Sequence, residues 1–359
     1  MAISVALGPA ATAGSVARVG AADSAAPAAC DGVWRPSALP SLANNDSLSG
    51  IDAVSGADVW AVGYDGGAPL ALHFDGASWT QTSLPVASGI LVGVLGFAAD
   101  DVWAAGSADG RPLILHFDGA AWEVSLQGSS PGSLSALGGV APDDVWAVGT
   151  TIVHWNGSSW SDVPHPDPGV DDNLTSVTAV ASDDVWAVGR FNPPNVSKTL
   201  AQHWDGSDWS TVPTPNPDPG EPNHASLAAV VDDGHSVWAL GMRASGHTGT
   251  TDTRPLVERW NGSRWAIFNI AFGHPGELLG AFSQGPSATW AVGSYRRDAG
   301  SGQRRLILRW NGVAWVDEPV TGVSGGAELR AVTGAGTDRW AAGGLLSFAA
   351  DSVIVHACG

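Results

Sequence analysis

The sequence predicts an all-β fold, a seven-bladed β-propeller with four antiparallel strands in each blade. Two short motifs recur along the chain, the first of them at spacings of 40 to 52 residues. The last copy of one motif is cut off at the C-terminus, and its missing half stands near the N-terminus. Units of this length with four strand signals each are typical of propeller blades that close into a ring.

The first motif is Trp-Ala-x-Gly, preceded by Val, Thr or Arg. Its seven copies begin at Trp60, Trp103, Trp146, Trp186, Trp238, Trp290 and Trp340. Each copy lies in a short apolar run bounded by turn residues, which indicates a buried strand. No 3.6-residue periodicity appears between these runs, so a helical solenoid is excluded.

The second motif is His/Arg-aromatic-Asp/Asn-Gly-x-x-Trp. Six complete copies begin at His73, His116, His154, His203, Arg259 and Arg309. A seventh begins at His356 and ends at Gly359 without its Trp. Residues 30–40 (CDGVWRPSALP) read like residues 75–85 (DGASWTQTSLP), which places Trp34 where the missing Trp belongs. We therefore expect the N-terminal strand to complete the C-terminal blade, which closes the ring without a free sheet edge.

The first repeat shows the four strands expected in each blade. They cover residues 48–54, 59–63, 69–74 and 79–85, and Gly- and Asp-rich turns separate them. The third residue of each expected first strand is small: Gly50, Gly93, Ala136, Ser176, Ala229, Gly280 and Ala331. Small residues fit the crowded strands nearest the axis, so the first strand is expected to be innermost.

The two cysteines belong to this closure. Cys30 and Cys358 both align with Asp75 of the first repeat, so they become neighbours if the two terminal strands share a blade. We expect a disulfide between them, and therefore an oxidising compartment and an exported protein.

Composition limits the partners. The 16 basic and 35 acidic residues give a formal charge of −19, which argues against nucleic-acid binding and an anionic membrane surface. No apolar run in residues 30–359 is long enough for a transmembrane helix. We expect a monomer with a cationic partner or none.

Residues 1–29 are excluded from the propeller. They are Ala-rich and aperiodic, and they end in Ala-Pro-Ala-Ala before Cys30, as in a signal-peptide cleavage region. A basic n-region is absent. We interpret the segment as a degenerate signal or a disordered leader, residues 30–359 as one propeller, and the protein as secreted or extracellular.

The paired units DDVWAVG (183–189) and HWDGSDW (203–209) resemble a tandem repeat of exported bacterial seven-bladed propellers, mostly of unassigned function. They are similar, more loosely, to tectonin-type lectin propellers. The resemblance covers residues 30–359 and implies the fold and, through the lectins, a carbohydrate ligand. The galactose-oxidase/kelch group is a further comparison, although its paired-Gly strand signature is absent.

Loops point to a ligand-binding face. The turns inside the motifs are short and uniform, whereas the other two connections of each blade vary and share the opposite face. They are long at 164–174, 190–199, 213–227, 242–255, 270–278 and 294–305. We expect the ligand-binding residues to be Arg190, His224, Arg243, His247, His274, Tyr295 and Arg296.

The repeated side chains have a structural interpretation. A His or Arg that recurs in each blade is expected to make a hydrogen bond between blades. The Trp rings are expected to form the core, and the alternative is that some line grooves between blades and stack on sugar rings.

Signals for catalysis and metals are few. Gly322-Val323-Ser324-Gly325-Gly326 matches Gly-x-Ser-x-Gly without a strand–turn–helix context. Neither a His-Glu-x-x-His nor a Cys-x-x-Cys zinc motif occurs. We expect no cofactor, with Ca²⁺ as an alternative on Asp167, Asp171, Asp172 and Asp218, near Glu221.

Two functions follow. The first is a non-catalytic, exported propeller that binds a ligand, a glycan or another cell-surface ligand, through its variable loops or inter-blade grooves. The second is an enzyme (a lyase, hydrolase or cyclase) at the mouth of the axis, with His224, His247, His274 and Arg243 as catalytic groups.

Overall fold

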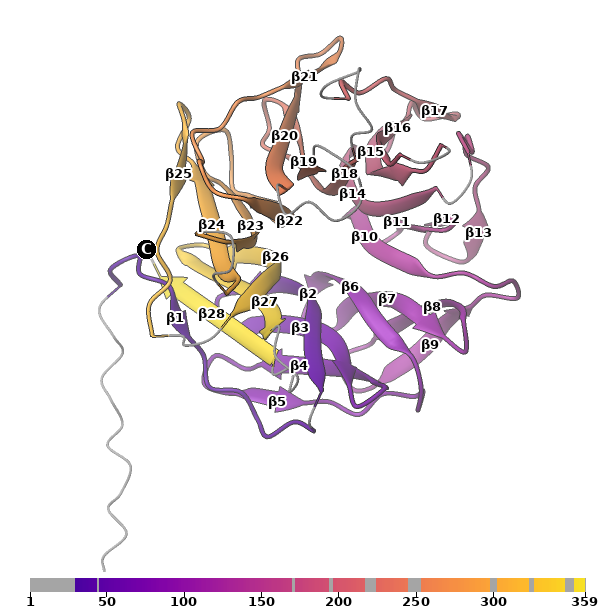
Figure 1. The fold of residues 1–359 in the computed structure, drawn as a ribbon. Helices are drawn as coiled ribbons and strands as arrows, with labels where there is room; N and C mark the ends of the chain where they lie inside the picture. The colour runs from indigo at the N-terminus through magenta and orange to yellow at the C-terminus, as the bar shows by residue number, and fades with distance from the viewer. Residues whose placement is uncertain are drawn as a thin grey trace, which may run out of the picture.

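The fold is a ring of seven four-stranded antiparallel sheets, as the sequence predicts (Figure 1). The computed structural model describes residues 30–358 except 44, 170–171, 194–195, 217–223, 245–252, 298–301, 323–325 and 346–351. All the regular elements in this part of the chain are strands. None of its segments forms a helix long and apolar enough to cross a membrane.

Each blade takes four consecutive strands. Blade 1 holds β2 (Asp46–Ser55), β3 (Asp58–Asp65), β4 (Ala68–Phe74) and β5 (Trp79–Gln81). Blade 2 holds β6 (Ile90–Ala98), β7 (Asp101–Ala108), β8 (Arg111–Phe117) and β9 (Trp122–Gln127). Blade 3 holds β10 (Leu134–Ala141), β11 (Asp144–Gly149), β12 (Ile152–Trp155) and β13 (Trp160–Asp162). Blade 4 holds β14 (Asn173–Ala181), β15 (Asp184–Phe191), β16 (Lys198–Trp204) and β17 (Trp209–Thr211).

The remaining blades follow the same order up to the ring closure. Blade 5 holds β18 (His224–Asp232), β19 (Val237–Ala244), β20 (Thr253–Trp260) and β21 (Trp265–Ile267). Blade 6 holds β22 (Gly276–Ser283), β23 (Thr289–Tyr295), β24 (Arg304–Trp310) and β25 (Trp315–Asp317). Blade 7 holds β26 (Ala327–Ala335), β27 (Asp338–Leu345), β28 (Ser352–Cys358) and the N-terminal β1 (Arg35–Pro36).

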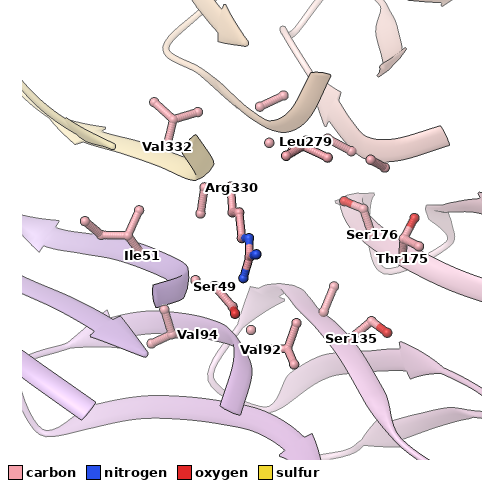
Figure 2. Close-up of a pocket in the computed structure, with 18 of the residues that line it drawn as sticks. Ser49, Ile51, Val92, Val94, Ser135, Thr175, Ser176, Leu279, Arg330 and Val332 are labelled. Carbon is pink, nitrogen blue, oxygen red and sulfur yellow. The ribbon is translucent and has the colours of Figure 1, made fainter. Parts of the chain in front are cut away.

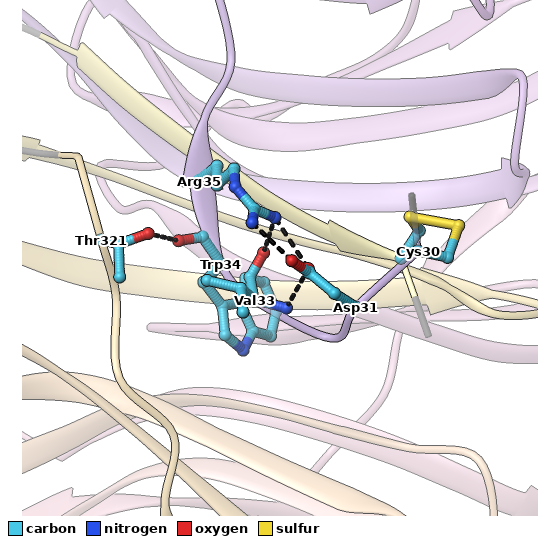
Figure 3. A network of polar contacts seen from close by, with 7 residues as sticks. Cys30, Asp31, Val33, Trp34, Arg35 and Thr321 are labelled. Carbon is cyan, nitrogen blue, oxygen red and sulfur yellow. Dashed lines mark hydrogen bonds and ion pairs between the residues drawn. A yellow bond between two sulfur atoms is a disulfide. The ribbon is translucent and has the colours of Figure 1, made fainter. Parts of the chain in front are cut away.

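The closure of the ring is confirmed. Strand β1 pairs with β28, with Arg35 opposite His356, and the sheet order is β1-β28-β27-β26. Cys30 and Cys358 form a disulfide with their Cα atoms 4.9 Å apart (Figure 3). Thr321 bonds the carbonyl of Trp34, which ties the completed blade to the connection from blade 6 (Figure 3). The sheet therefore has its outer strand supplied from the other end of the chain.

The first strand of each blade is innermost, and the motif glycine explains how closely it packs. A Cβ on Gly189 would lie 1.9 Å from the carbonyl oxygen of Asn173 on the first strand of blade 4. The other six motif glycines face the equivalent carbonyl at 1.9 to 2.1 Å. The second strand can thus approach the innermost strand only where it lacks a side chain.

Tryptophan rings fill the spaces between blades. Trp60 of blade 1 meets Trp122 of blade 2 edge to face, with centroids 5.3 Å apart. The same pair recurs along the ring, as Trp103–Trp160, Trp146–Trp209, Trp186–Trp265 and Trp238–Trp315. Fourteen of the 18 tryptophans are buried, with exposed fractions of 0 to 7%. These 14 rings therefore form the core, which is the first of the two interpretations of the repeated tryptophans.

The repeated His stays within its own blade. His73 stacks on Trp60 at 4.2 Å, and a 2.9 Å hydrogen bond joins its Nε2 to Oδ1 of Asp58 in the neighbouring strand. The same arrangement recurs at His116, His154, His203 and His356. The expectation of a bond between blades was wrong, because the Asp that opens the second strand lies beside the His of the third. In blade 5, Arg259 replaces the His, lies over Trp238 and bonds Ser236.

Candidate functional site

A cavity of about 640 Å³ lies on the axis of the ring, lined by the first strands of all seven blades (Figure 2). The seven small residues at the third strand position all line it, which confirms their predicted place near the axis. The cavity reaches Ile90, Glu277 and Glu328, which lie where their strands begin. Because the long connections enter the first strands there, the cavity lies toward the face of the variable loops.

The wall combines hydroxyl groups with aliphatic side chains. Its hydroxyls come from Ser49, Ser135, Thr175 and Ser176 (Figure 2). Its aliphatic groups include those of Ile51, Val92, Val94, Leu279 and Val332 (Figure 2). Such a mixture can hold a ligand with a carbon skeleton and a few polar groups.

Three charged side chains belong to this wall: Glu277, Glu328 and Arg330. Arg330 extends toward the middle of the cavity in Figure 2. Its Nε donates to Oε1 of Glu328 at 2.6 Å, and its Nη1 donates to Oγ of Ser47 at 3.0 Å. The guanidinium thereby links blade 7 to blade 1, and its charge is largely offset by Glu328.

Glu277 has a different environment. Its Oε1 accepts hydrogen bonds from Oγ of Ser294 at 3.1 Å and from Nε2 of Gln303 at 3.4 Å. Its Oε2 accepts none from the described residues, and none of their cations lies within ion-pair distance of Glu277. Burial and the nearby negative charge of Glu328 raise the pKa of Glu277, against the hydrogen bond of Ser294.

These charged positions break the sevenfold repeat. A buried leucine occupies the same place in each first strand, at Leu48, Leu91, Leu134, Leu174, Leu227, Leu278 and Leu329. The residue before it is Ser47, Ile90, Ser133, Asn173, Ser226, Glu277 or Glu328. The residue after it is Ser49, Val92, Ser135, Thr175, Ala228, Leu279 or Arg330. At these two positions, carboxylates thus occur only in blades 6 and 7 and a guanidinium only in blade 7. A position needed only for packing would be expected to carry the same kind of residue in every blade.

The ligand-binding residues predicted from the loops are spread over blades 4 to 6. Arg190 is exposed on β15, and Nδ1 of His224 accepts a bond from the amide of Ser197 at 3.2 Å. Arg243 pairs with Arg254 between β19 and β20 and lines a small pocket of about 190 Å³. His224 and Arg243 thus have different neighbours.

The other predicted residues lie around blade 6. His274 and Tyr295 pack together, with ring centroids 5.6 Å apart, and both contact Phe272. Arg296 is exposed, and its positive charge partly opposes the rise in the pKa of Glu277 that burial causes. His247 lies outside the described residues, so the convergence of three His is untested, while His224 and His274 have separate partners.

The predicted calcium site is described only in part. Asp171, Asp218 and Glu221 lie outside the described residues. Burial raises the pKa of Asp172, and the nearby charge of Asp167 adds to the rise. The residues described contain no group of three or more His, Cys, Asp or Glu that could hold a metal. Calcium binding stays a prediction.

One inter-blade groove is open on the face of the short turns. A pocket of about 480 Å³ between blades 4 and 5 is lined by His203, His235, Asp184, Asp232 and Trp260. Trp260 is half-buried, unlike the tryptophans of the core, and packs on Trp186 at 4.8 Å. In this groove Trp260 offers the aromatic surface that stacking on a sugar ring would require.

The charged residues of the axis were missed by the loop-based reasoning. Glu277, Glu328 and Arg330 lie in the first strands, which appeared uniform because only their third residue was compared. A comparison of all seven first strands position by position would have shown the departures, since they stand beside the repeated leucine.

Comparison with known proteins supports the fold. No family model and no curated protein matches the sequence. Among solved structures, YCF48 bound to a D1 peptide is similar, at 16% identity and a TM-score of 0.62 over 91% of this chain and 97% of that one. YCF48 from Cyanidioschyzon merolae is 17% identical, with a TM-score of 0.60 over 91% and 98%. The WD40 propeller domain of Doa1 is 13% identical, with a TM-score of 0.59 over 90% and 96%. At these identities the likeness establishes a β-propeller and nothing finer.

Proposed function

We propose that this protein is an exported, non-catalytic propeller that binds a segment of a partner protein at the loop-side mouth of its axis. The observation that carries the proposal is the axial cavity, where Glu277, Glu328 and Arg330 depart from the repeat. Side chains that vary on a repeated scaffold mark the place where that scaffold has been specialised. Export is supported by the Cys30–Cys358 disulfide, since such bonds persist in oxidising compartments.

The cavity has a suitable size and chemistry for a peptide segment. Its volume of about 640 Å³ falls within the range of ligand pockets and would take a few residues of an extended chain. Serine and threonine hydroxyls can bond peptide groups, and the aliphatic wall can cover side chains. A YCF48 structure carries a D1 peptide according to its description, which supports peptide binding here only by analogy of fold.

The test uses a displayed library of random dodecapeptides. Parent protein should enrich peptides that no longer bind when Ser135→Trp fills the cavity. The matched control is Ser263→Trp, the same substitution on an exposed turn of the opposite face, which should retain binding. Thermal unfolding confirms that both variants are folded. Equal binding by the parent and Ser135→Trp, or the absence of enriched peptides, contradicts the proposal.

A glycan is the second candidate ligand, and the groove between blades 4 and 5 favours it. Half-buried Trp260 offers an aromatic surface, while Asp184 and Asp232 offer acceptors for sugar hydroxyls. Glycan-array binding should be lost in Asp232→Ala and kept in Asp208→Ala, which removes an exposed carboxylate elsewhere. Binding unaffected by Asp232→Ala would exclude this groove.

A further inference from the structure

We propose that the axial cavity recognises one lysine side chain of its partner, with Glu277 accepting the ammonium group. This inference rests on the proposed function, because it names the group that enters the same cavity. It follows from the charges of the wall, the free oxygen of Glu277 and the shape of the surroundings.

The charge of the wall is unbalanced. Two carboxylates face one guanidinium, and that guanidinium already bonds Glu328 and Ser47. Glu277 is thus the lining carboxylate to which neither Arg330 nor another described cation bonds, and the charges of Arg296 and Arg330 act on it only from a distance. A carboxylate removed from water is stabilised when a cation approaches it, so a cationic group is the ligand that best complements this wall.

The free oxygen gives the direction of approach. Ser294 and Gln303 both donate to Oε1 and hold the carboxylate in one orientation. Among the residues that the structure describes, none donates to Oε2, so this oxygen is the one offered to a ligand. Gln303 also bonds Ser294, so the three side chains form a connected support. A ligand donor that reaches Oε2 would complete this network without displacing a partner.

The surroundings favour lysine over arginine or a metal ion. A single free carboxylate oxygen suits a compact ammonium group, whereas a guanidinium prefers two parallel acceptors. Aliphatic side chains such as Val92, Leu279 and Val332 can cover the four methylene groups of a lysine. The described residues offer no group of three metal ligands around Glu277.

The experiment compares two small probes that differ only in the charged group. Nα-acetyl-lysine amide and Nα-acetyl-norleucine amide are titrated at millimolar concentration by calorimetry or ligand-observed NMR. We expect the parent protein to bind the lysine probe at least tenfold more tightly. Glu277→Gln should reduce the preference to within twofold. The matched control Glu123→Gln, on exposed β9 of blade 2, should keep it.

Each outcome of this experiment supports or overturns the inference. Equal affinity of the parent protein for both probes overturns the inference, and so does a lysine preference that Glu277→Gln leaves intact. If Glu277→Gln does not fold, the comparison of the two probes on the parent protein still tests the inference. Library peptides that require an open cavity but carry no lysine would overturn the inference while leaving the proposed function standing. If no library peptide binds the axial cavity of the parent protein, the proposed function itself is overturned.

Discussion

The indole Nε1 of Trp34 donates a 2.8 Å hydrogen bond to Oε2 of Glu318, across the seam between blades 7 and 6. The two residues are 284 positions apart in the chain. Glu318 lies three residues after Trp315, the tryptophan that opens the outer strand of blade 6. The N-terminal strand is thus held by a side chain of the preceding blade as well as by β28.

The same relationship recurs where the chain provides an acceptor. Thr82 accepts from the indole of Trp122 at 3.3 Å, and Ser125 accepts from that of Trp160 at 3.1 Å. Three blades carry an apolar residue at this position, namely Val163, Val212 and Phe268. The indole groups that would face them, in Trp209, Trp265 and Trp315, have no hydrogen-bond partner. Trp79 also lacks one, although Ser37 occupies the equivalent position.

Supplying the missing acceptor should stabilise the ring. Val163→Thr keeps the shape of the side chain and offers a hydroxyl to Trp209, which should raise the free energy of unfolding by about 1 kcal/mol. The reciprocal change Thr82→Val should lower it by a similar amount, since it leaves Trp122 unpaired. Urea unfolding measures both. A loss of stability in Val163→Thr as large as that in Thr82→Val would contradict the assigned role.

The disulfide should stabilise the ring only when it is formed. Removing the bond that closes a loop of 328 residues is expected to cost up to about 5 kcal/mol, through the entropy of the unfolded chain. Cys30→Ser should therefore unfold at a lower temperature than the parent under oxidising conditions. With a reductant the two proteins should unfold alike. A parent protein whose stability does not respond to reductant would refute a stabilising disulfide.

Glu258 should make stability depend on pH. Its carboxylate is fully buried on β20 between blades 4 and 5, and neither oxygen has a hydrogen-bond partner. Burial raises the pKa of Glu258 to about 8. A carboxyl group with a raised pKa in the folded state stabilises below its unfolded pKa and loses that effect as the pH rises through 8. The free energy of unfolding should therefore fall between about pH 4.5 and 8, by an amount on the order of a few kcal/mol.

A substitution isolates this effect. The equivalent residue in five other blades is apolar: Leu72, Leu115, Val153, Leu308 and Val355. Glu258→Leu should remove the fall in stability toward pH 8 and exceed the parent in stability there. Gln202→Leu, at the same position of blade 4, removes a neutral amide and should leave the pH profile unchanged. An unaltered profile in Glu258→Leu would assign the pH dependence to other groups.

The motif glycines should tolerate no side chain. In Gly189→Ala the added carbon would lie 1.9 Å from the carbonyl oxygen of Asn173, so strands β14 and β15 must separate. We expect a loss of about 3 kcal/mol in the free energy of unfolding. Gly273→Ala, with open space around the new carbon, should change stability by less than about 0.5 kcal/mol. Similar values for the two variants would mean that the strands can shift freely.

The candidate site was harder to predict than the fold. Residues such as Arg190 and His224 were chosen because variable loops often carry function, and the structure places them on β15 of blade 4 and β18 of blade 5. Glu277 and Arg330 lie 53 positions apart, and each belongs to a strand that otherwise follows the repeat. The repeat predicts that both strands lie near the axis, but which of their side chains face one cavity depends on how the blades close into the ring.

The sequence by itself determined the number of blades, their four-strand order and the closure through Cys30 and Cys358. This was possible because each blade forms from consecutive residues, and a repeated motif reports the same local pairing seven times. The tertiary structure alone decided what each repeated side chain touches. It placed His73 on Asp58 of its own blade, left Glu258 unpaired between two blades and gathered three charged groups at the axis. Contacts across blades depend on the angle and spacing of neighbouring sheets, which the motifs do not encode individually.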